Sequence, residues 1–302
     1  MTTTPFIAAR VQPAQAGAGA LAYMLFGLGG LLALGATYAA ALGWLYFRQE
    51  RLLFEPDPLP QDHRLSEDAD VHERFVDVPG ARLAAAQLKL PASAGVVFFL
   101  HGNSGNLQKW FVELDAFRAL NFDLVMFDYR GFGKSSGRIE SEAQLHADVR
   151  AVWSAFAPQY AGRHAVIIGQ SLGTALAAGL SADLSAEGSA PDLTMLVSPY
   201  SSMQALADEI FPWVPRQVLR YPLPTLDHAR RMTCPLMLIH GDKDELIGFH
   251  HSEALHVAVP QASLLKVEGA GHSDVHQFAS FREALASALV LLGTGAAHCN
   301  AT

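Results

Sequence analysis

The sequence contains only two cysteines, Cys234 and Cys299, in 302 residues. Cys234 precedes an apolar stretch, and Cys299 lies among the last residues of the chain. Their spacing resembles neither a metal site nor a disulfide framework. A disulfide-stapled scaffold and a cysteine-ligated zinc module are therefore excluded, and cysteine usage leaves the redox compartment open.

Basic residues are also scarce. The chain has 21 Lys and Arg against 29 Asp and Glu, a net charge of -8, and it shows no basic stripe. A nucleic-acid partner is not expected, because binding a phosphate backbone needs concentrated positive charge. His272 and His276 are four residues apart, but no glutamate follows the first, so the zinc-protease pattern is missing. We expect no metal ion and no organic cofactor.

Charge is missing altogether between Val11 and Phe47. A helix over the most apolar part, residues 21–47, would be about 40 Å long, more than the roughly 30 Å of a bilayer core. Trp44, Tyr46 and Phe47 end the run directly before charged residues, as interfacial aromatics do. The pattern predicts a transmembrane anchor over 21–47. A signal peptide cleaved near Ala39–Ala41 is the alternative.

The rest of the chain is long enough for one large α/β domain. We predict a disordered N-terminus over 1–20, a Pro- and acid-rich linker over 48–70, a folded domain over 71–293 and a tail over 294–302. Positive charges flank the apolar run on both sides, so they do not assign the membrane face of the domain. Nothing in the sequence indicates an oligomeric state.

Short apolar runs alternate with helical patterns along the folded domain. A hairpin is predicted around Pro79-Gly80, and later runs resemble strands buried on both faces. Such alternation predicts a mostly parallel sheet flanked by helices. The expected strands cover 71–78, 82–90, 96–100, 123–128, 165–169, 192–197, 236–240 and 263–267, and the expected helices 107–120, 249–258, 277–292 and one that starts at Ser141.

The most informative stretch is Val166–Ala175, in which an apolar run ends in Gly-Gln-Ser-Leu-Gly and a small-residue helix pattern follows. A G-x-S-x-G pattern between a strand and a helix is typical of a nucleophile elbow. The glycines allow a tight turn in which larger side chains would collide with the strand and the helix. Ser171 is therefore the candidate nucleophile, at a helix N-terminus that favours developing negative charge.

An acid and a histidine follow Ser171 at two later strand ends, where a parallel sheet collects its active-site groups. Asp242, Asp244 and Glu245 come after the strand over 236–240, and His272 follows the strand over 263–267. The order serine, acid, histidine is that of a nucleophile-elbow hydrolase. The residues alone leave the choice among the three acids open.

Five segments, HGNSGN, DYRGFGKSSG, GQSLG, HGDKDELI and GAGH, together resemble the α/β-hydrolase superfamily. With YFRQERLLFEP, the sequence is most similar to its single-span, membrane-anchored branch, which includes lipid esterases and protein depalmitoylases. The resemblance covers residues 45–292 and implies that Asp244 is the triad acid and Asp242 stabilises its loop. It also implies an oxyanion hole made by the backbone N–H groups of Asn103 and Leu172.

The fold implied is an α/β-hydrolase fold with a short cap over about 199–231, rich in proline and aromatic residues. We expect Asp128 and Arg130 to form a hydrogen-bonded pair beside the elbow. We read His101 and His240, which end two strands, as structural groups that anchor loops.

These features predict a membrane-anchored serine hydrolase that cleaves lipid or acyl esters through a Ser171–His272–Asp244 triad. The same triad would also suit an acyl-protein thioesterase or a peptidase. A hydrolase-like scaffold without activity is the remaining alternative, although it has no need of all three side chains. The expected partners are an ester substrate and, through the apolar helix, a membrane.

Overall fold

The computed structural model describes residues 16–294; the expectations for residues 1–15 and 295–302 lie outside the described residues. The chain divides into two units, 1–47 and 48–302. Helix α1, Ala16–Leu53, begins inside the segment for which disorder is predicted. Its part Tyr23–Leu53 is long and apolar enough to cross a membrane. The predicted anchor over 21–47 lies within α1.

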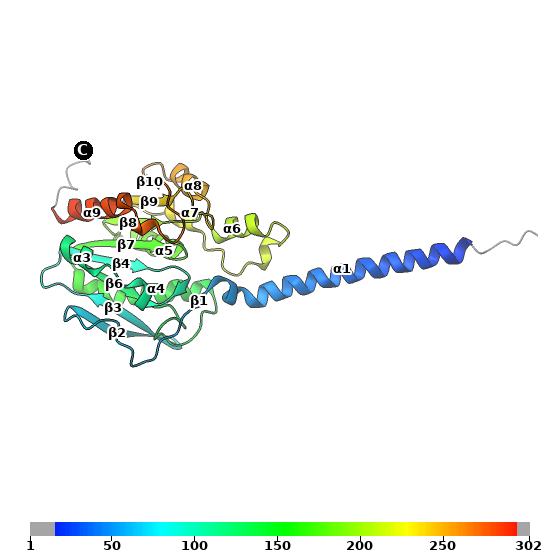
Figure 1. The fold of residues 1–302 in the computed structure, drawn as a ribbon, viewed down its shortest axis with the longest axis horizontal. Helices are drawn as coiled ribbons and strands as arrows, with labels where there is room; N and C mark the ends of the chain where they lie inside the picture. The colour runs from blue at the N-terminus through cyan, green and yellow to red at the C-terminus, as the bar shows by residue number, and fades with distance from the viewer. Residues whose placement is uncertain (1–15, 295–302) are drawn as a thin grey trace, which may run out of the picture. The chain divides into compact units, whose positions relative to one another are not determined.

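An eight-stranded sheet forms the centre of the second unit, in the order β10-β9-β8-β7-β4-β6-β3-β2 (Figure 1). The six strands from β10 to β6 run parallel, whereas β3 is antiparallel to both of its neighbours. The strands are β2 Val71–Val78, β3 Ala81–Leu88, β4 Gly95–Leu100, β6 Phe122–Phe127, β7 His164–Gln170, β8 Leu193–Val197, β9 Leu236–Gly241 and β10 Ser263–Val267. The predicted α/β-hydrolase architecture is confirmed.

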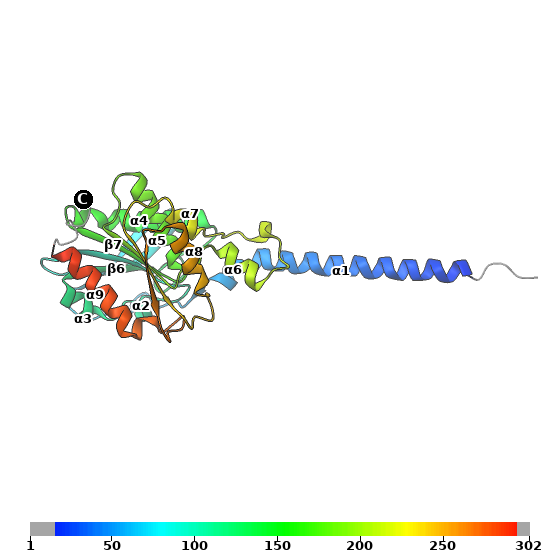
Figure 2. The ribbon, with the colours of Figure 1, turned by 90° about the horizontal axis from the view of Figure 1, so that it is seen from above.

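Helices cover both faces of this sheet (Figure 2). One face carries α2 Leu107–Trp110, α3 Leu114–Leu120 and α9 Ala279–Gly293; the other carries α4 Glu142–Phe156, α5 Gly173–Ala186, α7 Thr225–Ala229 and α8 His250–Ala258. Strand β4 shows how the sheet separates two cores. Phe98 packs into one apolar cluster, and its neighbour Val97 packs into the other, because successive side chains point to opposite faces.

Capping side chains explain where some of the helices begin. Helix α4 begins after Ser141, whose hydroxyl accepts a hydrogen bond from the Gln144 N–H at 3.1 Å. The single helix expected over 107–120 is instead two helices, α2 and α3. Glu113 lies between them with φ 58°, a left-handed conformation that interrupts the helix.

Residues 48–70 differ from the linker that their composition predicts. Strand β1, Glu55–Pro56, pairs in parallel with β5, Ser104–Gly105, and Pro58 bridges to Gly133. The start of this segment is therefore bound to the hydrolase domain. The predicted cap, 199–231, contains α6 Met203–Ile210, the short helix η2 Arg216–Val218 and α7; short helices η1 Ala157–Tyr160 and η3 Val275–Gln277 complete the elements.

Candidate active site

Ser171 lies at the turn between β7 and α5 and has φ 51°. A Cβ atom on Gly169 would lie 2.3 Å from the Gly173 carbonyl oxygen, and one on Gly173 would lie 2.0 Å from the Leu100 carbonyl oxygen. Because these contacts are shorter than any real Cβ contact, only glycine fits at either position. The Ser171 N–H donates to the Val197 carbonyl at 2.9 Å, which ties the turn to β8.

The structure brings Ser171, His272 and Asp244 together. His272 Nε2 lies 2.9 Å from Ser171 Oγ, and His272 Nδ1 lies 2.7 Å from Asp244 Oδ2. A carboxylate can only accept, so Nδ1 carries the ring proton and Nε2 is left to accept from the Ser171 hydroxyl. The three residues come from the loops that follow β7, β9 and β10, at the carboxyl-terminal ends of these strands.

The Asp244 carboxylate is held on all sides. Its Oδ1 accepts hydrogen bonds from the N–H groups of Leu246 at 3.0 Å and Ile247 at 2.8 Å. Burial by itself would raise the pKa of Asp244, but hydrogen bonds from His240, His272 and Ile247 outweigh it and hold the pKa well below its usual range. Asp244 is therefore a stable anion over the whole neutral pH range.

His240 contacts Asp244, which the sequence analysis did not predict. Its Nε2 lies 3.2 Å from Asp244 Oδ2 and 2.8 Å from the Ile247 carbonyl, both acceptors, so Nε2 carries a proton. Nδ1 then accepts from the Ser252 hydroxyl at 2.7 Å. His240 is fully buried. The signal was its position at the end of β9, four residues before Asp244.

The loop that follows β4, residues 101–106, faces the nucleophile. A Cβ atom on Gly102 would lie only 3.6 Å from the Cβ of Ser171. Burial lowers the pKa of His101 to about 4, so its ring is neutral, and Nδ1 lies 2.7 Å from the Gly102 carbonyl. The backbone N–H groups of Asn103 and Leu172 have no backbone acceptor within residues 16–294 and lie on the two loops beside Ser171.

The expected pair between Asp128 and Arg130 is wrong. Arg130 forms a two-pronged ion pair with Asp148, at 2.5 and 2.8 Å, while Asp128 Oδ1 accepts from the Leu107 N–H at 2.9 Å. Burial raises the pKa of Asp128 to about 7. Asp128 therefore supports the start of α2, and Arg130 ties its loop to α4.

Asp242 links the two loops that carry the acid and the histidine. Its Oδ1 accepts from the Gly269 N–H at 2.7 Å, so the loop after β9 is tied to the loop after β10. This is the stabilising role that the family resemblance implies for Asp242.

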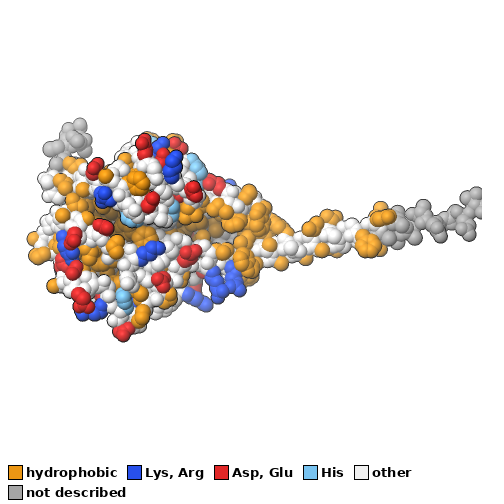
Figure 3. Space-filling model, viewed as in Figure 1, with side chains coloured by type: hydrophobic (Ala, Val, Ile, Leu, Met, Phe, Trp, Pro, Cys, Tyr) orange, Lys and Arg blue, Asp and Glu red, His pale blue; other side chains and the backbone are white. Residues whose placement is uncertain are grey.

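The cap presents large apolar side chains to its surroundings. Ile210, Phe211 and Trp213 are 52%, 41% and 50% exposed. In Figure 3, apolar side chains gather around α6, and a hollow lined with them runs from there across the face of the domain. Such a surface suits an apolar substrate better than a small charged one.

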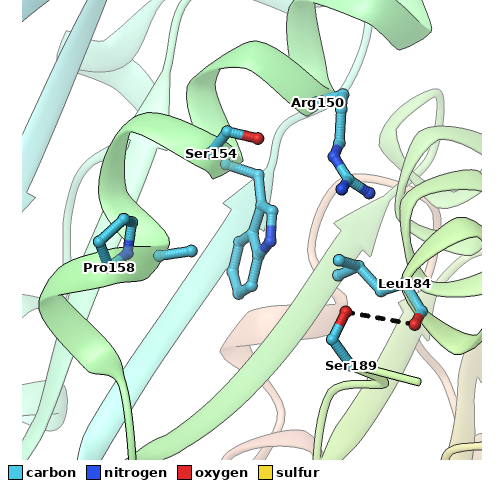
Figure 4. A pocket seen from close by; sticks show the side chains of 7 residues that line it. Arg150, Ser154, Pro158, Leu184 and Ser189 are labelled. Carbon is cyan, nitrogen blue, oxygen red and sulfur yellow. Dashed lines mark hydrogen bonds between the residues drawn. The ribbon is translucent and has the colours of Figure 1, made fainter. Parts of the chain in front are cut away.

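A pocket of about 340 Å³ lies elsewhere, between α4, η1 and the end of α5 (Figure 4). Its lining includes Trp153, Pro158 and Leu184. Leu184 lies about 17 Å along the α5 axis from the nucleophile end of that helix, given 1.5 Å per residue. The pocket is therefore separate from Ser171.

Glu209, His250 and His251 bring three possible ligand atoms within 4.8 Å of one another. The Ser201 N–H, however, donates to His251 Nδ1 at 3.3 Å. A neutral imidazole then carries its proton on Nε2, which faces Glu209 Oε1 at 3.5 Å and has no lone pair for a metal ion. The cluster is better described as a hydrogen-bonded contact between Glu209 of α6 and the two histidines of α8, with His250 Nε2 2.9 Å from Glu209 Oε1.

Comparisons with known proteins agree with this geometry. Residues 95–231 match the family model described as "alpha/beta hydrolase fold". The chain is 32% identical to alpha/beta hydrolase domain-containing protein 17B of Xenopus laevis, over 68% of this chain and 70% of that protein. It is also 32% identical to protein 17C of Homo sapiens, over 65% of this chain and 58% of that protein.

Solved structures share the fold at low sequence identity. An esterase of Pyrococcus furiosus has a TM-score of 0.61 and 18% identity, over 80% of this chain and 97% of that one. An alpha-beta hydrolase of Vibrio vulnificus has a TM-score of 0.62 and 18% identity, over 73% of this chain and 82% of that one. With its fold, its serine turn and these relatives, the chain belongs to the α/β-hydrolase fold family.

Proposed function

We propose that this protein is a membrane-anchored serine hydrolase that cleaves carboxylic esters of apolar acyl chains through an acyl-enzyme. The observation that carries the proposal is the continuous hydrogen-bonded line from Ser171 Oγ through the His272 ring to Asp244, with links of 2.9 and 2.7 Å. The roles of all three residues belong to the proposal.

In the acylation step, Ser171 Oγ attacks the ester carbonyl carbon while its proton passes to His272 Nε2. Asp244 keeps the ring in the reactive tautomer and stabilises the imidazolium that forms. The carbonyl oxygen becomes an oxyanion, which accepts hydrogen bonds from the Leu172 and Asn103 N–H groups. The tetrahedral intermediate collapses, and the alcohol leaves with the proton from His272.

Water then completes the cycle. His272 removes a proton from a water molecule, which attacks the acyl carbonyl carbon on Ser171 Oγ. A second tetrahedral intermediate forms in the same oxyanion site, and its collapse releases the carboxylic acid and restores the Ser171 hydroxyl. The step needs no metal ion and no redox partner.

The apolar cap and the apolar helix support a lipid-linked substrate. Ile210, Phe211 and Trp213 expose apolar surface on the cap. Residues 23–53 are long and apolar enough to cross a membrane, and such an anchor would hold the site near membrane-embedded esters and raise their effective concentration. We therefore expect turnover to rise with acyl chain length.

An acyl thioester is the second candidate substrate. A solved relative in fold is described as a thioesterase domain from a curacin biosynthetic pathway, with a TM-score of 0.55 and 17% identity. The same attack and the same oxyanion contacts serve a thioester, so the geometry of Ser171 does not separate the two classes. A panel of matched oxygen esters and thioesters does.

The test uses the full chain in detergent and a fluorophosphonate probe, which reacts with activated serines. The wild type should be labelled and should hydrolyse p-nitrophenyl esters, with a preference for longer acyl chains presented in micelles. Ser171→Ala should lose labelling and lower turnover by about 10⁶-fold, as removal of a triad nucleophile does. Labelling that persists in Ser171→Ala, with the fold intact, would show that another serine is the nucleophile.

A further inference from the structure

The segment that directly follows the apolar helix is bonded to the loop facing the nucleophile. The pairing of β1 with β5 places Glu55 beside Ser104 and Pro56 beside Gly105. The Asp57 N–H adds a hydrogen bond to the Gly105 carbonyl at 3.2 Å. Residues 53–57, which we name the strap, therefore lie along residues 103–106 of that loop.

Asn103 receives two of these contacts. Its side-chain amide donates to the Leu53 carbonyl at 3.1 Å, and its own carbonyl accepts from the Glu55 N–H at 2.8 Å. Both bonds use groups other than the Asn103 N–H. The strap thus grips the residue from its side chain and its carbonyl and leaves the N–H available for an oxyanion.

His101 sets the direction of that N–H. The Gly102 carbonyl and the Asn103 N–H belong to one peptide plane, and in a trans peptide they point in opposite directions. Because His101 Nδ1 binds the Gly102 carbonyl at 2.7 Å, this plane has a fixed orientation. The bonds from the strap to Asn103 then hold this peptide plane in position.

The strap is itself firmly held. Phe54 is 4% exposed and makes an edge contact with Tyr221 of the cap, with ring centroids 5.4 Å apart. Just upstream, the Gln49 side chain donates to the Val218 carbonyl and accepts from the Arg220 N–H, both at 2.7 Å. Residues 49–57 therefore connect the cap to the 101–106 loop through one continuous stretch of chain.

We propose that the strap positions the Asn103 backbone N–H as an oxyanion donor and that the Asn103 side-chain amide, bound to the Leu53 carbonyl, is the positioning group that fixes it. This proposal rests on the proposed serine hydrolase function. An oxyanion donor contributes only when it lies within hydrogen-bonding distance of the forming oxyanion, so a small displacement of the loop lowers turnover with little effect on substrate binding.

The test compares full-length variants in detergent. Asn103→Asp keeps the size and shape of the side chain but cannot donate to the Leu53 carbonyl, and Asn103→Ala removes the group. Gln61→Ala is the matched control, because the Gln61 amide donates to the Lys134 carbonyl at 3.0 Å from the same N-terminal segment but outside the 101–106 loop. For each variant, kcat, KM, thermal unfolding and inhibition by an alkyl trifluoromethyl ketone are measured. The ketone reports the oxyanion site directly, because Ser171 converts it to a hemiketal oxyanion.

Both Asn103 variants should lower kcat about tenfold, leave KM within about twofold, and weaken ketone inhibition by the same factor as kcat. Gln61→Ala should match the wild type in kcat and ketone inhibition. Equal kcat in Asn103→Asp and Gln61→Ala, or a KM effect without weaker ketone inhibition, would overturn the positioning role. Ser171→Ala separates this outcome from failure of the proposed function, since retained activity in that variant would count against the triad itself.

Discussion

Two loops face each other across the candidate site, and they are held in different ways. The Ser171 turn is held by close backbone packing, because Gly169 lies against the Gly173 carbonyl and Gly173 lies against the Leu100 carbonyl, and neither position has space for a side chain. The 101–106 loop depends on partners far along the chain, with Leu53 and Glu55 on one side and Tyr129, which donates to the His101 carbonyl at 2.8 Å, on the other.

The two loops are therefore expected to be sensitive to different kinds of substitution. A turn packed tightly against backbone atoms fails when one of its glycines is enlarged, even if its hydrogen-bond partners stay in place. A loop defined by distant contacts can keep its own sequence and still lose its function when its partners move. The following predictions use this contrast, and the largest effect comes first.

Gly173→Ala should disrupt the Ser171 turn. The new methyl group would lie 2.0 Å from the Leu100 carbonyl, so the turn, α5 or the end of β4 must shift. We expect a loss of about 3 kcal/mol in the free energy of unfolding, as overpacking a tight site costs, and a loss of fluorophosphonate labelling. Urea unfolding and probe labelling measure both. Gly293→Ala, at the end of α9, controls for adding a methyl group to a glycine, because the nearest atoms would lie at ordinary contact distances of 3.6 and 3.8 Å.

His240→Leu should test the support of the proposed triad acid, Asp244, by a neighbour only four residues away. The change removes the Nε2–H that lies 3.2 Å from Asp244 Oδ2. A hydrogen bond to a charged group is worth about 1.5–3 kcal/mol. We therefore expect kcat to fall roughly tenfold to a hundredfold, with KM little changed.

Ser252→Ala is the control for that variant, because it removes the partner of His240 Nδ1 and leaves the contact with Asp244. Steady-state kinetics of the two variants, with circular dichroism for the fold, decide the matter. If His240→Leu and Ser252→Ala lowered kcat equally, His240 would be acting only through the packing of its loop.

Acid should weaken the support of the nucleophile turn. Helix α5, which starts at this turn, packs at Gly179 against the His146 and His228 rings. Burial first, and the neighbouring His146 and Arg231 second, lower the pKa of His228 to about 4. Burial also lowers the pKa of His146.

The sign follows from proton uptake. Between pH 6.5 and 4 the unfolded chain binds a proton at His228 and the folded chain does not, so the contribution of His228 to the free energy of unfolding is full above about pH 6.5 and declines toward pH 4. His228→Gln should remove roughly 1–2 kcal/mol of this decline, seen in urea unfolding at several pH values. An unchanged pH slope in His228→Gln would contradict the assignment.

The sequence predicted the features that are local. The strand-turn-helix around Ser171 and the order of strand-end acids and histidine are readable because each depends on a few neighbouring residues. The structure then brings Ser171, Asp244 and His272 within hydrogen-bonding distance. Likewise, the hairpin at Pro79-Gly80 forms between β2 and β3 as its turn residues predict.

The features that sequence did not predict are pairings between distant residues. Asp128 and Arg130 are neighbours in sequence, yet Arg130 chooses Asp148 on α4, and no local pattern encodes that choice. Residues 48–70 have the composition of a linker, but composition cannot show that Glu55 and Pro56 add a strand beside Ser104 and Gly105. The break at Glu113 is a similar case, because it lies inside an otherwise helical pattern.

The pairing of β1 with β5 also bears on how this protein should be trimmed for expression without its apolar segment. A version that begins at residue 60 would keep all eight strands of the central sheet and would be expected to fold. Such a soluble version would nevertheless lack Leu53 and Glu55, and a weak activity in it would say little about the native enzyme. The safer boundary lies before Gln49, whose side chain is bonded to the cap.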